Sequence, residues 1–201
     1  MYTTHKPMIQ IEHTFKTKAH DLKALFEGTV KMSTFMRKLE QQAELDPDRY
    51  DRDKYVGDGF EFFVELFLKL SDPDNRIGVY NYEPTQENDN GVDGVGVNIK
   101  GEKCVVQIKF RGNTQILLTA NQDHLAHLIS DGALAHGVDP DRVNDKNYRH
   151  FIFTTAEGLH YYTNDEFFKS KVKCFAYNDF RSMLDGNTAF WNKAREIVMN
   201  L

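Results

Sequence analysis

Three polar residues with the donor types of a metal centre lie in the middle of the chain: Asp93, Gln107 and Lys109. Gln107 and Lys109 are separated by one residue, so on a β-strand both side chains point from the same face. A carboxylate and an amide carbonyl are hard oxygen ligands that suit Mg²⁺, and the backbone carbonyl of Ile108 can add a further oxygen. An ammonium group beside such a metal can orient a water molecule or stabilise developing negative charge. Together these residue types indicate metal-assisted hydrolysis of a phosphate ester.

Two carboxylates on a predicted helix, Glu61 and Glu65, are candidates to complete the ligand shell. One helical turn separates them, so both can face the same point. Glu61 is the preferred ligand, and Glu65 is a candidate for a supporting role. The alternatives are that Glu61 is simply solvated and that Glu65 forms an ion pair with Lys69, four residues further along the helix.

The spacing of these residues restricts how their strands can pair. Residues 92–99 alternate in hydrophobicity, and residues 104–110 have the composition of a partner strand in a hairpin. With a two-residue loop, Asp93 would lie on the opposite face from Lys109. With a three-residue loop at 100–102, Asp93 pairs with Lys109 and the polar groups converge. We therefore predict the longer loop, or a bulge near Asp93.

Three stretches of the sequence match the motifs of one nuclease family. They are GDGFE at 57–61, which is followed by an apolar helix, NGVDG at 90–94, and VVQIKF at 105–110. On these stretches the chain resembles the PD-(D/E)XK nuclease superfamily, and most closely its Mrr-like branch of restriction endonucleases. The resemblance covers roughly residues 56–155. It implies that the functional residues are Glu61, Asp93, Gln107 and Lys109, with Glu61, Asp93 and Gln107 at the metal.

The resemblance also implies a fold and an activity. The expected fold is α/β, with a restriction-endonuclease-like mixed β-sheet flanked by helices. The expected activity is Mg²⁺-dependent hydrolysis of phosphodiester bonds in DNA by an endonuclease, with Mn²⁺ able to substitute. The chain departs from the commonest motif because Gln107 stands in place of an acidic residue, a replacement that the Mrr-like branch tolerates. With one negative charge fewer, metal affinity should fall and Glu61 should become more important.

Two polar residues after this strand are candidates for contact with DNA. Arg111 is placed to bind a phosphate, although a surface arginine needs no function. Gln122 is the second candidate, but with Thr119 it also forms a capping box, which favours a role in helix capping. His124 and His127 lie three residues apart on the same predicted helix. Because the sequence places no third ligand beside them, we interpret both as surface residues.

Each part of this constellation also has a purely structural interpretation. Asp93 lies in the run DNGVDG, whose residue types are common in turns. Gln107 and Lys109 are also compatible with the solvated face of a half-exposed strand. The alternative function is therefore a catalytically inactive DNA-binding or protein-interaction module on the same fold. Lys109 favours the enzyme, because a scaffold without chemistry needs no ammonium group beside a metal-binding aspartate.

The periodicity of the sequence predicts a helical N-terminal extension over residues 1–50 and a nuclease domain over residues 51–201. Helices are expected at about 19–26, 32–43, 55–70, 119–135 and 188–198. Strands are expected at about 76–82, 92–99, 104–110, 150–155 and 172–177. This order is typical of a mixed sheet flanked by helices.

Charge and composition limit the classes of protein. The net charge is −5, from 25 basic and 30 acidic residues, which disfavours a passive nucleic-acid binder but allows an enzyme with local basic patches. The N-terminus lacks the features of a secretory signal and no apolar run is long enough to cross a membrane, so we expect a cytoplasmic protein. Cys104 and Cys174 are then expected to be buried, reduced thiols. A homodimer is a further expectation, because cutting both DNA strands needs two active sites.

Overall fold

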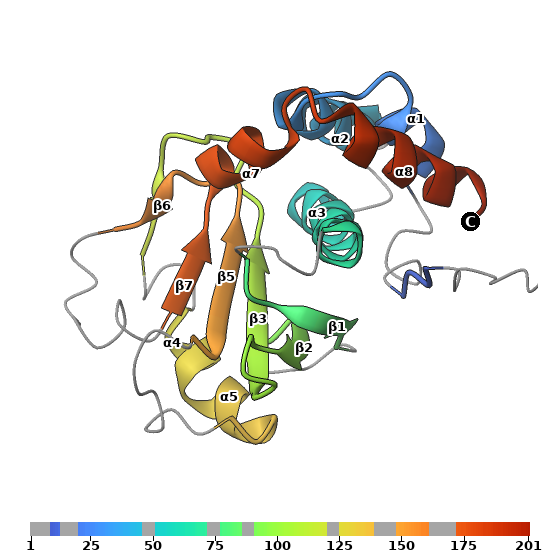
Figure 1. The fold of residues 1–201 in the computed structure, drawn as a ribbon. Coiled ribbons are helices and arrows are strands. Elements are labelled where there is room, and N and C mark those ends of the chain that lie inside the picture. Colours follow the sequence, from blue (N-terminus) through green and yellow to red (C-terminus); the bar gives the residue numbers. More distant parts are fainter. Residues whose placement is uncertain are drawn as a thin grey trace, which may run out of the picture.

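The computed structural model describes most of the chain and shows an α/β protein with a five-stranded mixed sheet flanked by helices (Figure 1). The described residues are 9–12, 20–45, 51–71, 77–85, 91–119, 125–138, 148–160 and 172–201. Among them, no helix is long and apolar enough to cross a membrane. The predicted α/β class with a mixed, helix-flanked sheet is confirmed at this level.

The sheet contains an antiparallel half and a parallel half that meet at its central strand. Its strands, in spatial order, are β1 (Tyr80–Pro84), β2 (Gly94–Val97), β3 (Lys103–Lys109), β5 (His150–Thr154) and β7 (Val172–Phe175). The β1–β2 and β2–β3 pairs are antiparallel, whereas β3–β5 and β5–β7 are parallel. All five predicted strands are present, but the first begins four residues later than expected. Gly78 has a φ of 84°, a turn conformation that delays the start of β1.

The loop between β2 and β3 has the predicted length of three residues, but it begins one residue earlier than expected. The Asn98 amide donates to the Glu102 carbonyl (2.8 Å), and the Gly101 amide donates to the Asn98 carbonyl (2.8 Å). These bonds leave a three-residue loop over 99–101 instead of 100–102. Gly101, with a φ of 76°, supplies the left-handed residue that such loops require.

This loop shifts the strand register by two residues from the predicted one. Val97 pairs with Lys103, and Gly94 pairs with Val106. The Asp93 amide donates to the Val106 carbonyl (2.9 Å), so Asp93 and Gly94 lie opposite one residue, and the predicted pairing of Asp93 with Lys109 is wrong. This is a bulge at Asp93, the other alternative that the sequence offered. Because the shift is an even number of residues, the facing of the paired side chains over 94–97 is unchanged.

Helix α3 (Arg52–Leu70) lies between the sheet and a second helical layer (Figure 1). The Asp51 side chain begins it by accepting from the Asp53 amide (2.9 Å), and the Ser71 hydroxyl ends it by donating to the Phe67 carbonyl (2.6 Å). The outer layer consists of α1 (Leu22–Phe26), α2 (Met32–Leu45), α7 (Tyr177–Leu184) and α8 (Thr188–Met199). Helix α7 was not predicted; at its start the Asp179 carboxylate accepts from the Ala176 amide (2.8 Å).

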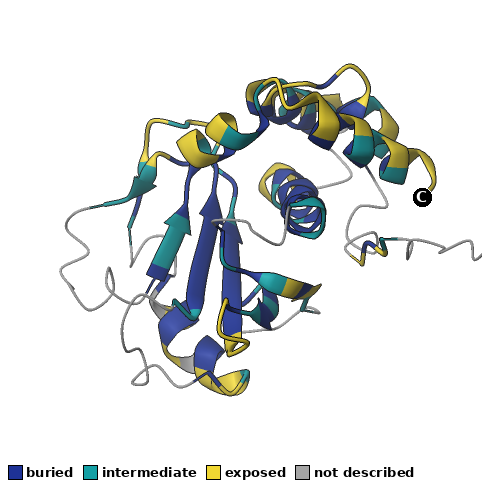
Figure 2. Ribbon diagram, viewed as in Figure 1, coloured by how far each residue is buried: buried dark blue, intermediate teal, exposed yellow. Residues whose placement is uncertain are grey.

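Aromatic side chains on opposite sides of α3 join these layers into one apolar core. Phe67 faces the sheet, with its ring 5.4 Å from that of Phe175. Phe63 instead contacts the outer layer, with its ring 4.5 Å from Phe35 of α2 and 6.0 Å from Trp191 of α8. Phe63 therefore packs on the outer layer, and α3 is covered on both sides. Figure 2 shows α3 and the central strands as the most buried elements.

The opposite face of the sheet is covered by two short helices. These are α4 (Leu125–Ile129) and α5 (Asp131–Ala135), which replace the later part of the single helix predicted over 119–135. The chain changes direction at Ser130, which precedes α5 with a ψ of −104°. Their apolar residues pack with Val92, Val105 and Ile152. A two-stranded parallel sheet of β4 (Leu117–Leu118) and β6 (Gly158–Leu159), not predicted from the sequence, lies beside this core.

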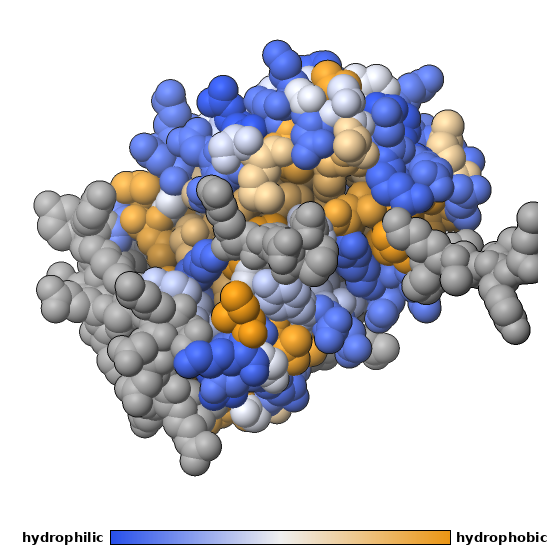
Figure 3. Space-filling model, in the orientation of Figure 1, coloured by the Kyte–Doolittle hydropathy of each residue, from blue (hydrophilic) through white to orange (hydrophobic). Residues whose placement is uncertain are grey.

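Apolar side chains on the surface are dispersed over several elements. Figure 3 shows hydrophilic side chains over much of the outer helical layer, with apolar side chains between them. The large exposed apolar residues of the described part are Val30, Leu45, Ile99, Ile116, Leu134, Met199 and Leu201. They come from several different elements, and the expected homodimer stays a prediction.

Candidate active site

Asp93 is the residue just before β2, where the regular pairing of β2 with β3 stops. Its amide donates to the Val106 carbonyl (2.9 Å). Its carboxylate Oδ2 accepts from the backbone amide of Ile108 (2.6 Å), so a side chain replaces the next backbone bond of the ladder. Ile108 is the residue between Gln107 and Lys109. The Asp93 carboxylate is therefore fixed beside the segment of β3 that carries the other two predicted site residues.

Gln107 and Lys109 point from the face of β3 that is covered by α4 and α5. Their neighbour Val105 belongs to the apolar cluster of that face, whereas Val106 and Ile108 belong to the cluster around α3. Alternation then places Gln107 and Lys109 with Val105. The regular pairing of β2 with β3 ends at Gly94 and Val106, and the Asp93 amide also bonds to the Val106 carbonyl, so Asp93 and Gly94 lie opposite the same residue. The face on which the Asp93 side chain projects therefore stays a prediction.

The side chain of Gln107 is buried without hydrogen bonds. Its exposed fraction is 0%, and neither Oε1 nor Nε2 has a hydrogen-bond partner in the described part of the chain. A Cβ atom added to Gly91 would lie 3.3 Å from Nε2 of Gln107 and 3.6 Å from Cβ of His127. The amide is therefore enclosed between β3, the segment before Asp93 and α4. A buried amide without a partner costs about 1–3 kcal/mol, and such a group calls for a ligand or a functional reason.

Two buried threonines hold the end of β3: Thr154, the last residue of β5, and Thr155, the residue after it. The Lys109 carbonyl accepts from the Thr154 hydroxyl (2.8 Å) and from the Thr155 amide (3.3 Å). The Thr155 hydroxyl also accepts from the Arg111 amide (2.5 Å) and donates to the Arg111 carbonyl (2.8 Å). These bonds fix the backbone and leave the half-buried side chains of Lys109 and Arg111 at the end of the sheet. From the sequence alone, the threonine pair at the end of the strand is the one signal for these contacts.

Glu61 lies half-buried on α3, which covers the face of the sheet opposite Gln107 and Lys109. The ring of the preceding residue, Phe60, is 5.9 Å from that of Phe110. Glu61 is thus level with the end of β3 that carries Lys109, and it is not in open solvent. The expectation that its carboxylate turns toward Asp93 stays a prediction.

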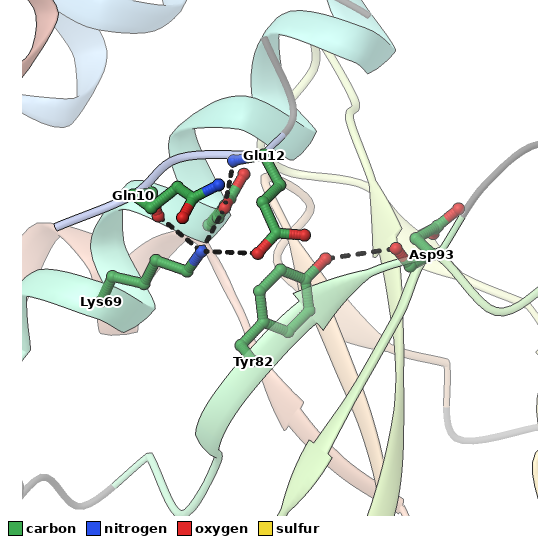
Figure 4. Close-up of polar contacts among 6 residues, drawn as sticks. Gln10, Glu12, Lys69, Tyr82 and Asp93 are labelled. Carbon is green, nitrogen blue, oxygen red and sulfur yellow. Dashed lines mark hydrogen bonds and ion pairs between the residues drawn. The ribbon is translucent and has the colours of Figure 1, made fainter. Parts of the chain in front are cut away.

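Glu65 ties the N-terminal segment to α3, beside the contacts of Lys69 with Gln10 and Glu12 (Figure 4). Its carboxylate has an exposed fraction of 0%, pairs with Lys69 (2.6 Å) and accepts from the Glu12 amide (2.7 Å). Lys69 also donates to the Gln10 carbonyl (2.7 Å). The ion pair with Lys69 is the alternative that the sequence offered for Glu65, and the geometry confirms it. These contacts account for the burial of Glu65 without a metal.

Of the other candidates from the sequence, only some lie in the described part of the chain. Gln122 and His124 lie outside the described residues. His127 is exposed on α4, with its Cβ near Gly91. The described residues contain no group of three or more His, Cys, Asp or Glu side chains placed to hold a metal ion. A metal at Asp93 would therefore rely on amide and backbone oxygens besides carboxylates.

The two cysteines are free thiols outside this site. Burial raises the pKa of both Cys104 and Cys174 to about 12. A thiol with such a pKa remains protonated at neutral pH and is a poor nucleophile. The chemistry of the site is therefore carried by oxygen and nitrogen groups.

Comparisons of the chain with protein-family models, with curated proteins and with solved structures found no match.

Proposed function

We propose that this chain is a metal-dependent endonuclease that hydrolyses phosphodiester bonds in DNA, on a restriction-endonuclease-like fold of the PD-(D/E)XK superfamily, Mrr-like branch. The observation that carries the proposal is the hydrogen bond between the Asp93 carboxylate and the Ile108 amide. It brings a carboxylate to the strand segment between a buried amide, Gln107, and an amine, Lys109. This is the combination that the sequence motifs imply.

The donor atoms at this point suit Mg²⁺. They are a carboxylate oxygen of Asp93, Oε1 of Gln107 and the carbonyl of Ile108, which faces the end of β2 as its amide does. The buried Gln107 amide, which lacks a hydrogen-bond partner in the described residues, is explained if it is a ligand. When bound, Mg²⁺ would polarise the phosphate and lower the pKa of a coordinated water molecule. Mn²⁺ accepts the same oxygen ligands.

The other residues of the chain have separate roles in this proposal. Lys109 orients the attacking water and stabilises the negative charge that develops on the phosphate. Glu61 supplies a second carboxylate, which compensates for the neutral Gln107. Arg111 contacts a phosphate of the DNA backbone just beyond Lys109. The activity is placed in the cytoplasm, where Cys104 and Cys174 stay reduced.

One observation favours the alternative, a catalytically inactive DNA-binding or protein-interaction module. Gln107 has no exposed surface, so DNA cannot touch it in this conformation. Asp93 and Lys109, however, are both half-buried, so a phosphate can approach from their side while Gln107 coordinates from beneath. The partial exposure of Asp93 and Lys109 therefore supports the enzyme, although the burial of Gln107 taken alone favours the inactive module.

A nicking assay on supercoiled plasmid tests the proposal directly. The purified chain should convert supercoiled DNA to nicked or linear DNA with Mg²⁺ or Mn²⁺, and the reaction should stop with EDTA. The panel should include linear, branched, modified and single-stranded DNA, because the site does not define the preferred substrate. If no substrate is cut while DNA is still bound, the inactive module becomes the better description.

Replacing Gln107 should separate stability from metal binding. Gln107→Leu fills the same space without polar atoms, so we expect the free energy of unfolding to rise by about 1 kcal/mol and Mn²⁺ affinity to fall by about tenfold or more. Chemical denaturation and calorimetry measure the two quantities. Gln107→Glu is the matched variant, and it should bind Mn²⁺ more tightly while unfolding more easily without metal. An unchanged Mn²⁺ affinity in Gln107→Leu would remove Gln107 from the ligand set.

A further inference from the structure

Tyr82 of β1 contacts the backbone of Asp93 (Figure 4). Its exposed fraction is 3%, and its hydroxyl donates to the Asp93 carbonyl (3.2 Å). Thr85, three residues further, donates through its amide to the same carbonyl (3.1 Å) and through its hydroxyl to the Val92 carbonyl (2.5 Å). The turn that carries Asp93 is thus held by three hydrogen bonds from the neighbouring strand.

An irregularity in the backbone around Tyr82 changes the direction of its side chain. The pairing of β1 with β2 is irregular between Tyr80 and Glu83, so one extra residue is inserted there. Within this stretch Asn81 has a φ of 49°, a left-handed conformation that costs free energy in a residue other than glycine. Bulges of this kind often lie next to active sites, where they redirect a side chain.

The partner strand leaves space for the redirected ring. A Cβ atom added to Gly94 would lie 2.2 Å from Cε2 and 2.5 Å from the hydroxyl oxygen of Tyr82. Any side chain at position 94 would therefore displace the ring from Asp93. The bulge at Asn81 and the glycine at 94 are two independent features that serve the same contact.

We infer that Tyr82 is a positioning residue for Asp93, and this inference rests on the proposed function. Besides its amide, which donates to the Val106 carbonyl, Asp93 is held at its carbonyl by Tyr82 and Thr85 and at its carboxylate by the Ile108 amide. Loss of the Tyr82 hydroxyl loosens the hold on the carbonyl, which lets the carboxylate move away from Ile108 and from the metal. Tyr82 itself touches neither metal nor DNA in this arrangement.

The test uses Tyr82→Phe, which removes the hydroxyl and keeps the ring. Mn²⁺ affinity, measured by calorimetry on the folded protein, should fall by about tenfold, the usual effect of losing a group that orients a ligand. Exchange of the Ile108 amide hydrogen, measured by NMR without metal, should accelerate by about fivefold, as expected for one weakened hydrogen bond. The matched control is Tyr80→Phe, because Tyr80 lies on the same strand and lines the same cavity as Tyr82. Neither quantity should change in this control.

The two readouts distinguish failure of this inference from failure of the proposed function. If Tyr82→Phe binds Mn²⁺ as the wild type does, or if Ile108 exchange is unchanged, the positioning role is wrong even when the wild type cuts DNA. If the wild type neither binds Mn²⁺ nor cuts DNA, the proposed function fails, and the Ile108 exchange alone decides the inference. Lower thermal stability with both readouts unchanged would mean a merely structural tyrosine.

Discussion

Lys109→Ala should reduce the rate of DNA cleavage by on the order of a hundredfold or more, the usual loss when an electrostatic stabiliser of the transition state is removed. Folding should be preserved, because the hydrogen bonds that fix this position come from Thr154 and Thr155 to the Lys109 carbonyl and do not involve its side chain. Mn²⁺ affinity should also be preserved, because an ammonium group is not a ligand. Single-turnover cleavage at saturating Mg²⁺, calorimetry and thermal unfolding measure the three quantities.

The matched control for this variant is Lys103→Ala. Lys103 lies at the other end of the same strand, is exposed and points from the same face by alternation. It should cleave DNA at the wild-type rate, because it is remote from Asp93. Lys109→Arg keeps the positive charge and should recover part of the activity. Cleavage by Lys109→Ala at the wild-type rate would refute the role assigned to this lysine.

The shared face of Gln107 and Lys109 was predictable from the sequence, whereas the register was not. The two-residue period of a strand places Gln107 and Lys109 together whatever the loop does. The pairing partner of Asp93 depends on where the turn forms, and the choice between 99–101 and 100–102 is made by the hydrogen bonds of Asn98. Its side-chain oxygen accepts from the Lys100 and Glu102 amides (both 3.0 Å), and this local competition is not visible in hydrophobic alternation.

The environment of α3 was harder to infer because it depends on elements distant in the chain. Helices α2 and α8 bury its outer side through Phe35 and Trp191, and its own sequence does not identify these partners. Glu65 looked like a ligand candidate from its spacing to Glu61. Besides Lys69, it also bonds to the Glu12 amide of the N-terminal segment, which no local pattern connects to α3.

The residues that hold the site in place were missed for a related reason. Tyr82, Thr85 and Thr155 act through backbone atoms of other strands. Every residue has a backbone carbonyl, so the residue type does not show which carbonyl accepts such a hydrogen bond. The nearest signals are Gly94, which makes space for Tyr82, and the paired threonines at 154 and 155. The role of this glycine and of these threonines can be recognised only once the strands are placed next to each other.

Asp93→Asn should abolish both Mn²⁺ binding and cleavage, and so should fail differently from Lys109→Ala. The substitution removes the charge that attracts the metal, and we expect cleavage to fall by on the order of a hundredfold or more. An asparagine oxygen can still accept from the Ile108 amide, so stability should change little. Calorimetry with Mn²⁺ and a cleavage assay at several Mg²⁺ concentrations measure the two losses.

Asp93→Ala separates the charge of Asp93 from its hydrogen bond. It leaves the buried Ile108 amide without its acceptor, which should lower the free energy of unfolding by about 1–3 kcal/mol in addition to the loss of metal. Asp185→Asn is the matched control, because Asp185 also accepts from a backbone amide, that of Met32 (2.9 Å), but lies outside the sheet. It should bind Mn²⁺ and cut DNA as the wild type does. Wild-type Mn²⁺ affinity in Asp93→Asn would place any metal elsewhere, and the ligand set around Ile108 would have to be abandoned.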